Sequence, residues 1–347
     1  EEGRFQLDDP IARFVPAFKD QRVFTGNSRG KIDTAPAERG ITFRDLLTHT
    51  SGLTYGFMES NIIDYTYRRQ GVDFQTAETS LKDVVEKAAA IPLIAQPGRA
   101  WNYSIATDVL GYLVEVVSGM PFEKFLMERV IRPLKLADTD FFVPEAKQSR
   151  LAANYSSDGK GGLALIDDPG KSRYLKPRTV NSGGGGLVST ASDYARFCQF
   201  MLNKGELDGV RLLGRKTVEL MTCNHLPGDM ASMGAARFSE ATYEGNGFGL
   251  GFAAKALAVR MAGRGWHITG TSRSQRGTDT IRQLGYAAAL FDGIAPSADV
   301  ARALATATHV LISVPPGSTG DRVLGCHRAD LAAAPRLAWI GYLSTVG

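Results

Sequence analysis

The chain has 347 residues, 44% of them hydrophobic, which suits one large or two ordinary globular domains. No apolar run of about 18 or more residues occurs, which excludes a transmembrane helix, and no basic-aromatic stripe suggests a nucleic-acid partner. The net charge of +4 is uneven, because residues 248–347 carry ten Arg or Lys against five Asp, whereas residues 1–247 carry 30 basic and 31 acidic groups. This mild excess is compatible with a phosphate-bearing cofactor.

The termini and the cysteines constrain the compartment only weakly. The first residues, "EEGRFQLDDP", include no initiator Met and no signal peptide, so we expect the natural start upstream and favour a cytoplasmic location. Cys198, Cys223 and Cys326 lie far apart without C-x-x-C spacing, which predicts buried free thiols rather than disulfides or a zinc site. The five His residues show no ligand pair at i, i+4, so we expect no structural metal.

The first 250 residues predict helices separated by loops and a few strands. In "TFRDLLTHTSG", Thr42 can cap a short helix that Gly52 ends. "TDVLGYLVEVVSG" is the clearest helix, with Gly119 as its stop and an apolar face made of Val109, Leu110, Leu113, Val116 and Val117. "SGGGGLVSTASDYARFCQFML" predicts a glycine-rich approach and an amphipathic helix capped by Thr190 or Ser192.

The last 100 residues have a different composition and rhythm. From Ala256 onward the chain contains no Lys and no Glu, and Ala dominates. A predicted helix over 253–263 precedes the strands "WHITGTS", "YAAALFD", "THVLISV" and "LAWIGYLS", which alternate with helices near 275–284, 298–307 and 328–334. Short apolar strands alternating with helices predict βαβ units and a parallel, Rossmann-type sheet.

Four segments of the first part resemble one family. "GRFQLDDPIARFVPAF", "ITFRDLLTHTSGLTYG", "PGRAWNYSIATDVLGYLVEVVSGMPFEKFL" and "GGGGLVSTASDYARF" are similar to the serine hydrolases related to class C β-lactamases, a group with family-VIII esterases and D-alanyl-D-alanine peptidases. The resemblance runs from residue 1 to about 252. It implies a mixed α/β fold, an antiparallel sheet flanked by helices, and acyl transfer from a small-molecule ester substrate without a cofactor.

The resemblance also implies site residues. In this family a Ser attacks a carbonyl, and a Lys three residues later on the same helix face accepts its proton. A tyrosine on a second loop also takes part in the proton transfer. That tyrosine is Tyr103 in "NYS". Ile105 stands where β-lactamases carry Asn, which favours simple carboxylic esters over β-lactams. In "HTSG" we interpret residues 49–52 as a helix-ending loop, with Ser51 as a less favoured nucleophile.

The nucleophilic pair is expected outside the chain. "SLKD" places Lys82 two residues after Ser80, and "GKSRYLK" places Lys176 four residues after Ser172, so neither reproduces the helical Ser-x-x-Lys spacing. By the resemblance the motif precedes Glu1, and further core strands follow the glycine-rich "GFGLGF". "GWHITG", with Trp266, is one match to the family's third motif, but the second strand of a nucleotide fold is the favoured interpretation.

Residues 248–347 resemble the amino-terminal part of atypical extended short-chain dehydrogenases, the NAD(P)-dependent epimerase/reductase group. In that interpretation Gly249 and Gly251 form the turn that approaches a pyrophosphate, Ala254 packs helix on strand, and Arg273 after "GTS" pairs with a 2′-phosphate. Asp292 follows the next strand and by the resemblance lies near the adenine. The fourth strand ends at Ser313 to Pro316. The fifth strand ends near Ser344 or Thr345, one of which would be the family's hydroxyl partner.

Each half is incomplete in this interpretation. The strand expected before the glycines is the polar "EATYEGNG", and no Y-x-x-x-K follows. We therefore predict a truncated β-lactamase/transpeptidase-like domain over residues 1–250, joined to a partial NAD(P)-binding Rossmann-like domain over 251–347. Its family function is ester hydrolysis, with the chain inactive as given. Two alternatives remain open, an NADP-binding module without turnover and a non-catalytic scaffold. The oligomeric state stays unknown.

Overall fold

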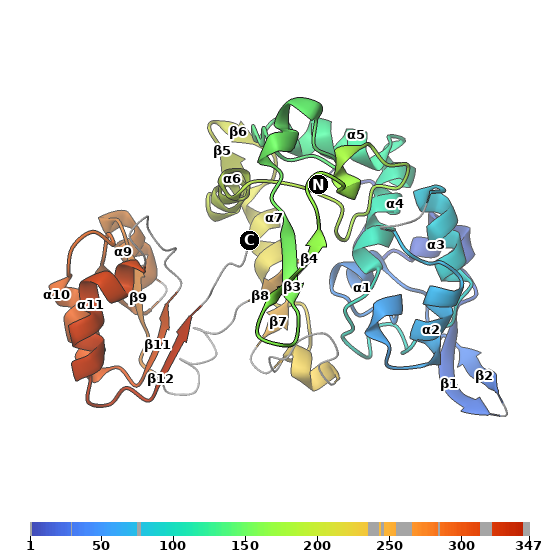
Figure 1. Cartoon of the computed structure of the whole chain (residues 1–347). Coiled ribbons are helices and arrows are strands. Elements are labelled where there is room, and N and C mark those ends of the chain that lie inside the picture. Colours follow the sequence, from blue (N-terminus) through green and yellow to red (C-terminus); the bar gives the residue numbers. More distant parts are fainter. Residues whose placement is uncertain are drawn as a thin grey trace. The chain divides into compact units, whose positions relative to one another are not determined.

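The computed structural model describes residues 2–28, 30–74, 78–234, 243, 246–254, 266–283, 285–312 and 321–342. The chain divides into two compact units, Glu1–Ala256 and Leu257–Gly347, where the sequence predicted a division near residue 250 (Figure 1). Among the described residues, no helix combines the length and the apolarity needed to span a bilayer.

The first unit is mainly helical. Its α-helices are α1 (Phe43–Leu47), α2 (Ile62–Arg69), α3 (Leu81–Ala89), α4 (Ala106–Ser118), α5 (Phe122–Leu126), α6 (Ala191–Leu202) and α7 (Arg215–Thr222). Short helical turns are η1 (Ile11–Arg13), η2 (Pro16–Phe18), η3 (Gly56–Met58), η4 (Met127–Ile131), η5 (Glu145–Arg150), η6 (Arg173–Leu175) and η7 (Met230–Met233).

The strands of this unit form antiparallel hairpins. They are β1 (Arg22–Ser28) with β2 (Lys31–Pro36), β3 (Asn154–Ser157) with β4 (Leu163–Asp167), β5 (Glu206–Leu207) with β6 (Val210–Arg211), and β7 (Gly247–Phe248) with β8 (Ala253–Ala254). Antiparallel pairing agrees with the expectation. The single flanked sheet that the resemblance implied is not formed by the described residues, whose strands pair only two by two.

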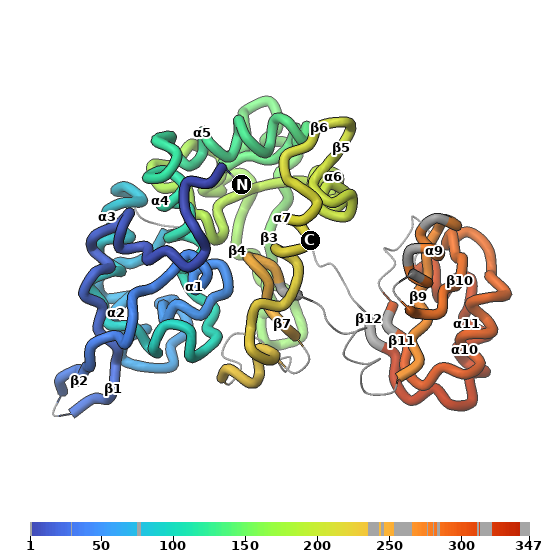
Figure 2. Tube along the Cα trace, turned by 180° about the vertical axis from the view of Figure 1, so that it is seen from behind, coloured from blue at the N-terminus to red at the C-terminus, as the bar shows by residue number. Residues whose placement is uncertain are grey.

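Helix α4 is the central element of the largest core. Val109 and Leu113 are 0% and 2% exposed, and Gly119 ends the helix with φ +72° and an N–H donated to the Glu115 carbonyl, as the sequence predicted. In both views α1 to α4 lie together, and the β1–β2 hairpin extends away from them (Figures 1 and 2). Buried apolar side chains from η1, η2 and these helices form one contiguous cluster, which fixes the start of α4.

The second unit alternates strands and helices, as predicted. Its elements are β9 (Thr269–Ser272), α9 (Gln275–Gln283), β10 (Ala287–Leu290), α10 (Ala298–Thr306), β11 (His309–Ile312), α11 (Arg322–Ala333) and β12 (Trp339–Tyr342). The pairs β9–β10 and β11–β12 are parallel, and α10 packs beside α11 (Figure 2). Its separate core contains Ala289, Phe291, Val300, Leu304, Ile312, Val323 and Leu331.

The cysteine prediction is right about pairing and wrong about burial. All three thiols are free. Cys198 and Cys223 are exposed and Cys326 is half-buried, because the first two lie on the outer face of α6 and just after the end of α7.

Candidate active site

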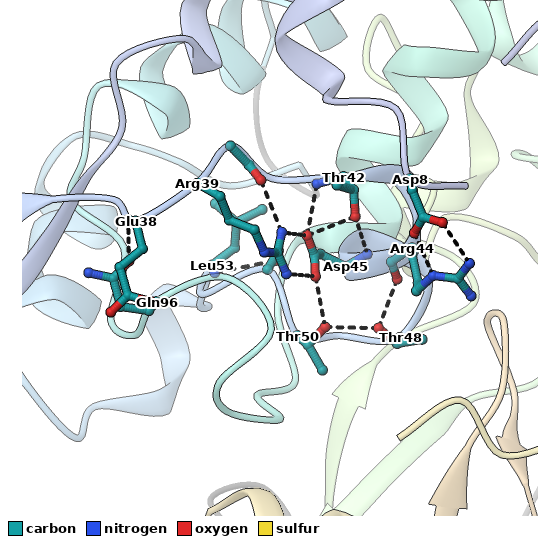
Figure 3. Close-up of polar contacts among 12 residues, drawn as sticks. Asp8, Glu38, Arg39, Thr42, Arg44, Asp45, Thr48, Thr50, Leu53 and Gln96 are labelled. Atoms are coloured by element: carbon teal, nitrogen blue, oxygen red, sulfur yellow. Dashed lines mark hydrogen bonds and ion pairs between the residues drawn. The ribbon is translucent and has the colours of Figure 1, made fainter. Parts of the chain in front are cut away.

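Asp45 anchors the first element of the site, α1. The Thr42 hydroxyl accepts the Asp45 N–H at 3.2 Å and the Asp45 carboxylate accepts the Thr42 N–H at 2.8 Å, which is a capping box. Arg39 donates to both carboxylate oxygens, at 2.6 and 2.8 Å, and the Thr50 hydroxyl donates at 3.3 Å (Figure 3). The buried carboxylate therefore ties the start of the helix to the loop that follows it.

That loop, residues 48–52, is held in one conformation. The Thr50 carbonyl accepts the Gly98 N–H at 2.7 Å. Gly52 has φ +82°, and an added Cβ would lie 2.2 Å from the Ala95 oxygen, so only glycine fits there. His49 has φ +56°, a conformation that residues with a side chain seldom adopt and that needs surrounding contacts to persist.

Those contacts enclose the His49 ring. It lies 5.9 Å from Trp101, 5.3 Å from Tyr103 and 5.4 Å from Phe248, measured between ring centroids, and its Nδ1 is 3.2 Å from the Ser104 hydroxyl. Burial lowers the pKa of His49 to about 4. The imidazole is therefore neutral at physiological pH.

Tyr103 is half-buried within an otherwise buried segment. The Asn102 N–H donates to the His49 carbonyl at 2.9 Å, and the Asn102 side chain donates to the Leu53 carbonyl at 2.7 Å. Its neighbours are all at most 7% exposed, namely Trp101, Asn102, Ser104, Ile105 and Ala106. The segment thus fixes its backbone inside the core and leaves Tyr103 as the least buried of residues 101–106.

Asp108 is a second buried group near Tyr103. This buried carboxylate accepts hydrogen bonds from the Ser182 hydroxyl at 2.5 Å, the Gly184 N–H at 3.0 Å and the Tyr55 hydroxyl at 3.2 Å. Burial raises the pKa of Asp108, and these hydrogen bonds oppose the shift. Burial, and secondarily the charge of Asp108, raise the pKa of Tyr103, so the phenol stays protonated.

The glycine run 183–186 passes close to the start of α4. A Cβ on Gly183 would lie 2.4 Å from the Thr107 carbonyl oxygen, and one on Gly184 would lie 2.7 Å from the Asp108 carboxylate and 2.8 Å from the Tyr55 hydroxyl. Only glycine permits this approach, so the run packs against Asp108 and Tyr55.

Burial agrees with one expectation about this region and corrects another. Ser51 is 0% exposed, so its hydroxyl is not accessible as a nucleophile. Ile105 is 1% exposed and belongs to the core cluster of the first unit, so it does not face a substrate in this structure. The substrate argument drawn from Ile105 therefore loses its geometric basis.

The search for Ser-x-x-Lys also needs correction. Two matches occur that the sequence interpretation missed, Ser28 with Lys31 and Ser157 with Lys160. Ser28 and Lys31 pair across the β1–β2 hairpin, and Ser157 ends β3 with Lys160 in the following turn. All four residues are exposed and none lies on a helix, so neither pair has the helical geometry that the chemistry requires.

Comparison with known proteins agrees with this arrangement. The beta-lactamase family model matches residues 1–309. The chain belongs to the beta-lactamase family. An uncharacterized protein of Mycobacterium tuberculosis is 38% identical over 72% of this chain and 60% of its own length. The lovastatin esterase of Penicillium rubens is 31% identical over 67% of this chain and 56% of its own length.

A solved structure of the family resembles the fold. EstCE1, a hydrolase with promiscuous acyltransferase activity, superposes with a TM-score of 0.56 and 26% identity, covering 75% of this chain and 65% of EstCE1. The chain thus spans little more than half of the length of the two curated relatives described above. The family match extends past residue 252, where we expected it to end, and includes β9, β10 and α10.

The glycine turn does not have the predicted nucleotide-binding geometry. Residues 253–254 form β8 rather than the start of a helix, and 255–263 lie outside the described residues. The N–H of Gly251 donates to the Leu47 carbonyl at 2.8 Å, and a Cβ on Gly249 would lie 2.2 Å from the Met221 oxygen. The turn with Gly249, Gly251 and Ala254 therefore closes a hairpin inside the first unit, and the helix expected from residue 253 does not begin there.

The remaining nucleotide residues lie in the second unit. Arg273 directly follows β9 and is exposed; Asp292 follows β10, where its carboxylate accepts the Ile294 N–H at 2.8 Å. Both lie at the carboxyl edge of one parallel strand pair. Ser313 to Pro316, Ser344 and Thr345 lie outside the described residues.

Three residues of the cluster around Tyr103 escaped sequence reasoning. His49 was visible in "HTSG" but was interpreted only as part of a loop. Tyr55 and Asp108 carry no local motif, since their partners are 53 to 76 residues away in the chain. The glycine run was the available signal, because several adjacent glycines often mark a close approach of backbone.

Proposed function

We propose that this chain carries the tyrosine side of a site that transfers acyl groups from small carboxylic esters, with Tyr103 as its proton-transfer group. The observation that carries the proposal is the half-buried Tyr103 on a segment whose other residues are buried and hydrogen-bonded to the His49 loop. The names of relatives support the reaction class, since they include an esterase and a hydrolase with acyltransferase activity.

The electrostatics favour a protonated phenol as the working form. Because its pKa is raised, Tyr103 is suited to donate a proton to the leaving alkoxide of the ester. The neutral His49 ring packs against it without adding charge. A serine nucleophile, activated by a lysine on the same helix, forms the acyl-enzyme in this scheme.

The chain as given is proposed to be inactive alone, because neither of its Ser-x-x-Lys matches lies on a helix. We expect no turnover of p-nitrophenyl butyrate and no labelling by a fluorophosphonate. Stoichiometric labelling of any serine, mapped by mass spectrometry, would overturn this part of the proposal, and Ser28 and Ser157 are the first residues to inspect.

The role of Tyr103 can be tested in a protein that also carries a nucleophilic serine and its lysine. Adding a helix that carries Ser-x-x-Lys, together with further core strands, should produce esterase activity. Tyr103→Phe in that protein should lower kcat by about 10²–10⁴-fold, the scale for losing one proton-transfer group. Tyr155→Phe, at an exposed tyrosine of β3, serves as the matched control. An unimpaired Tyr103→Phe enzyme would remove the assignment.

A second function, weak NADP binding by the second unit, is favoured by one observation. Arg273 and Asp292 follow neighbouring parallel strands, the edge at which α/β sheets bind ligands. We expect a dissociation constant of about 0.1 mM or weaker for NADPH, and weaker binding of NADH by about 1.5–3 kcal/mol. Calorimetric titration of NADPH and NADH into the native chain and into Arg273→Ala tests this binding. Equal affinity for both cofactors, or an NADPH affinity that Arg273→Ala leaves unchanged, would favour the scaffold alternative.

A further inference from the structure

We propose that Phe57 and Tyr55 form a platform for the flat, aromatic part of an ester, an inference that rests on the acyl-transfer function proposed above. The rings of Phe57 and Tyr55 stack with centroids 4.6 Å apart and planes 21° from parallel. The Tyr55 ring lies 5.3 Å from that of Tyr103, at 47°. The three rings form a continuous row that ends at the proton-transfer group.

The row begins at an exposed ring and continues to rings that are less exposed. Phe57 is 55% exposed, Tyr55 and Tyr103 are half-buried, and the His49 ring beyond them is 5% exposed. A phenylalanine with this exposure gives up much of the hydrophobic stabilisation that burial of its ring would provide. The row therefore presents an aromatic surface that leads from solvent to the phenol of Tyr103.

The turn that carries Phe57 is fixed before any ligand arrives. The Arg68 guanidinium donates to the Gly56 carbonyl, and a Cβ on Gly56 would lie 2.9 Å from Arg68 Cγ. The Ser60 hydroxyl donates to the Met58 carbonyl at 2.9 Å, and the Ser60 N–H donates to the Asp64 carboxylate at 2.8 Å. A braced turn loses little conformational entropy on binding, so the platform is preorganised.

Tyr55 is fixed from the other side. Its hydroxyl donates to the buried Asp108 carboxylate at 3.2 Å, which directs the phenol inward and sets the plane of the ring. Aromatic rings prefer offset-stacked or edge-to-face contacts with other rings, an attraction that a saturated ring of similar size does not share. The chemistry therefore favours aryl esters over esters of saturated cyclic alcohols.

The test uses two ketones that cannot be hydrolysed, in which CH₂ replaces the ester oxygen. Phenylacetone carries a flat ring and cyclohexylacetone a puckered ring with the same number of carbons. Ligand-observed NMR titration of the full chain should give phenylacetone a dissociation constant lower by about threefold to tenfold, the scale of one good ring contact. Phe57→Leu, which keeps an apolar side chain, should abolish that preference and change cyclohexylacetone binding by less than about twofold.

Two further variants complete the design. Phe57→Tyr should retain the preference, and Tyr194→Ala, at a 67% exposed tyrosine of α6, should leave it unchanged. Equal affinity for the two ketones, binding of neither, or a preference that survives Phe57→Leu would overturn the platform. The ketone titration requires no catalysis, so it tests the platform alone. The proposed function fails independently if no ester is turned over once a Ser–Lys helix is supplied.

Discussion

At the scale of single residues, His49 is the clearest case of a group whose chemistry is set by its surroundings. An exposed histidine would titrate near pH 6.5, whereas the rings of Trp101, Tyr103 and Phe248 exclude water from this one. Its left-handed backbone is held by the hydrogen bond from the Asn102 N–H and by the loop contacts of Thr50. The residue is therefore a neutral packing element beside the phenol of Tyr103.

This burial predicts a pH dependence of stability. Because the pKa of His49 is lowered to about 4, the unfolded chain binds its proton more readily, and the free energy of unfolding should fall as pH drops from about 6.5 to about 4. The loss from this group is about 3 kcal/mol at most. Asn tolerates the left-handed backbone, so His49→Asn should flatten that slope in urea titrations at several pH values.

His309→Asn is the matched control for the pH experiment. His309 is an exposed histidine of the second unit, so its replacement should leave the slope of the first unit unchanged. A slope that is the same in His49→Asn and in the native chain would show that His49 is protonated without cost in the folded state.

At the scale of elements, the start of α4 and the glycine run 183–186 behave as one structure. Asp108 accepts hydrogen bonds from Ser182 and Gly184, and the backbone of Gly183 lies against the Thr107 carbonyl. The N-terminus of α4, the loop and Tyr55 are thereby joined through one carboxylate. A side chain at Gly183 or Gly184 should separate the loop from the helix.

Gly183→Ala should therefore destabilise the first unit. Its Cβ would lie 2.4 Å from a backbone oxygen that cannot rotate away, and overpacking of this kind costs about 1–3 kcal/mol. Gly170→Ala is the control, since its Cβ would meet nothing closer than 3.5 Å. Chemical denaturation of both variants measures the difference; equal midpoints would show that the run moves without cost.

At the scale of the whole molecule, the largest core of the first unit and the core of the second unit are built from separate stretches of chain. The cluster around α4 uses residues before 181, and the cluster of the second unit uses residues after 288. Units with separate cores commonly unfold as separate cooperative transitions. The composition break at residue 256 coincides with the boundary between the compact units.

Calorimetry should accordingly resolve two unfolding transitions. Ile105→Asn places an amide in the core of the first unit without a partner and should lower one transition, by about 1–3 kcal/mol or more. Leu304→Ala removes a buried side chain from the other core and should lower the second transition by about 2–5 kcal/mol. A single transition shifted by both variants would show that the units unfold together.

The sequence alone was sufficient for features that depend on local order. The helix from Ala106 to Ser118, its glycine stop, the Thr190 cap and the alternation of strands and helices after residue 266 all follow from periodicity and capping residues close in the chain. The family resemblance of the first part was confirmed, because several short motifs in a fixed order are seldom shared by chance. Tyr103 was named from such a motif, and its role stays a prediction.

Only the tertiary structure decided which residues surround Tyr103 and how the glycines are used. Asp108, Tyr55 and Gly184 meet through contacts across more than 50 residues, and no local pattern encodes such a contact. "GFGLGF" is compatible with a hairpin or with a nucleotide turn, because glycine accepts both backbones. The Gly249 N–H donates to the Phe252 carbonyl across the turn and the Gly251 N–H donates to the Leu47 carbonyl, which together select the hairpin. Burial, which depends on every packed element at once, likewise decided against Ser51 as a nucleophile and against a substrate contact of Ile105.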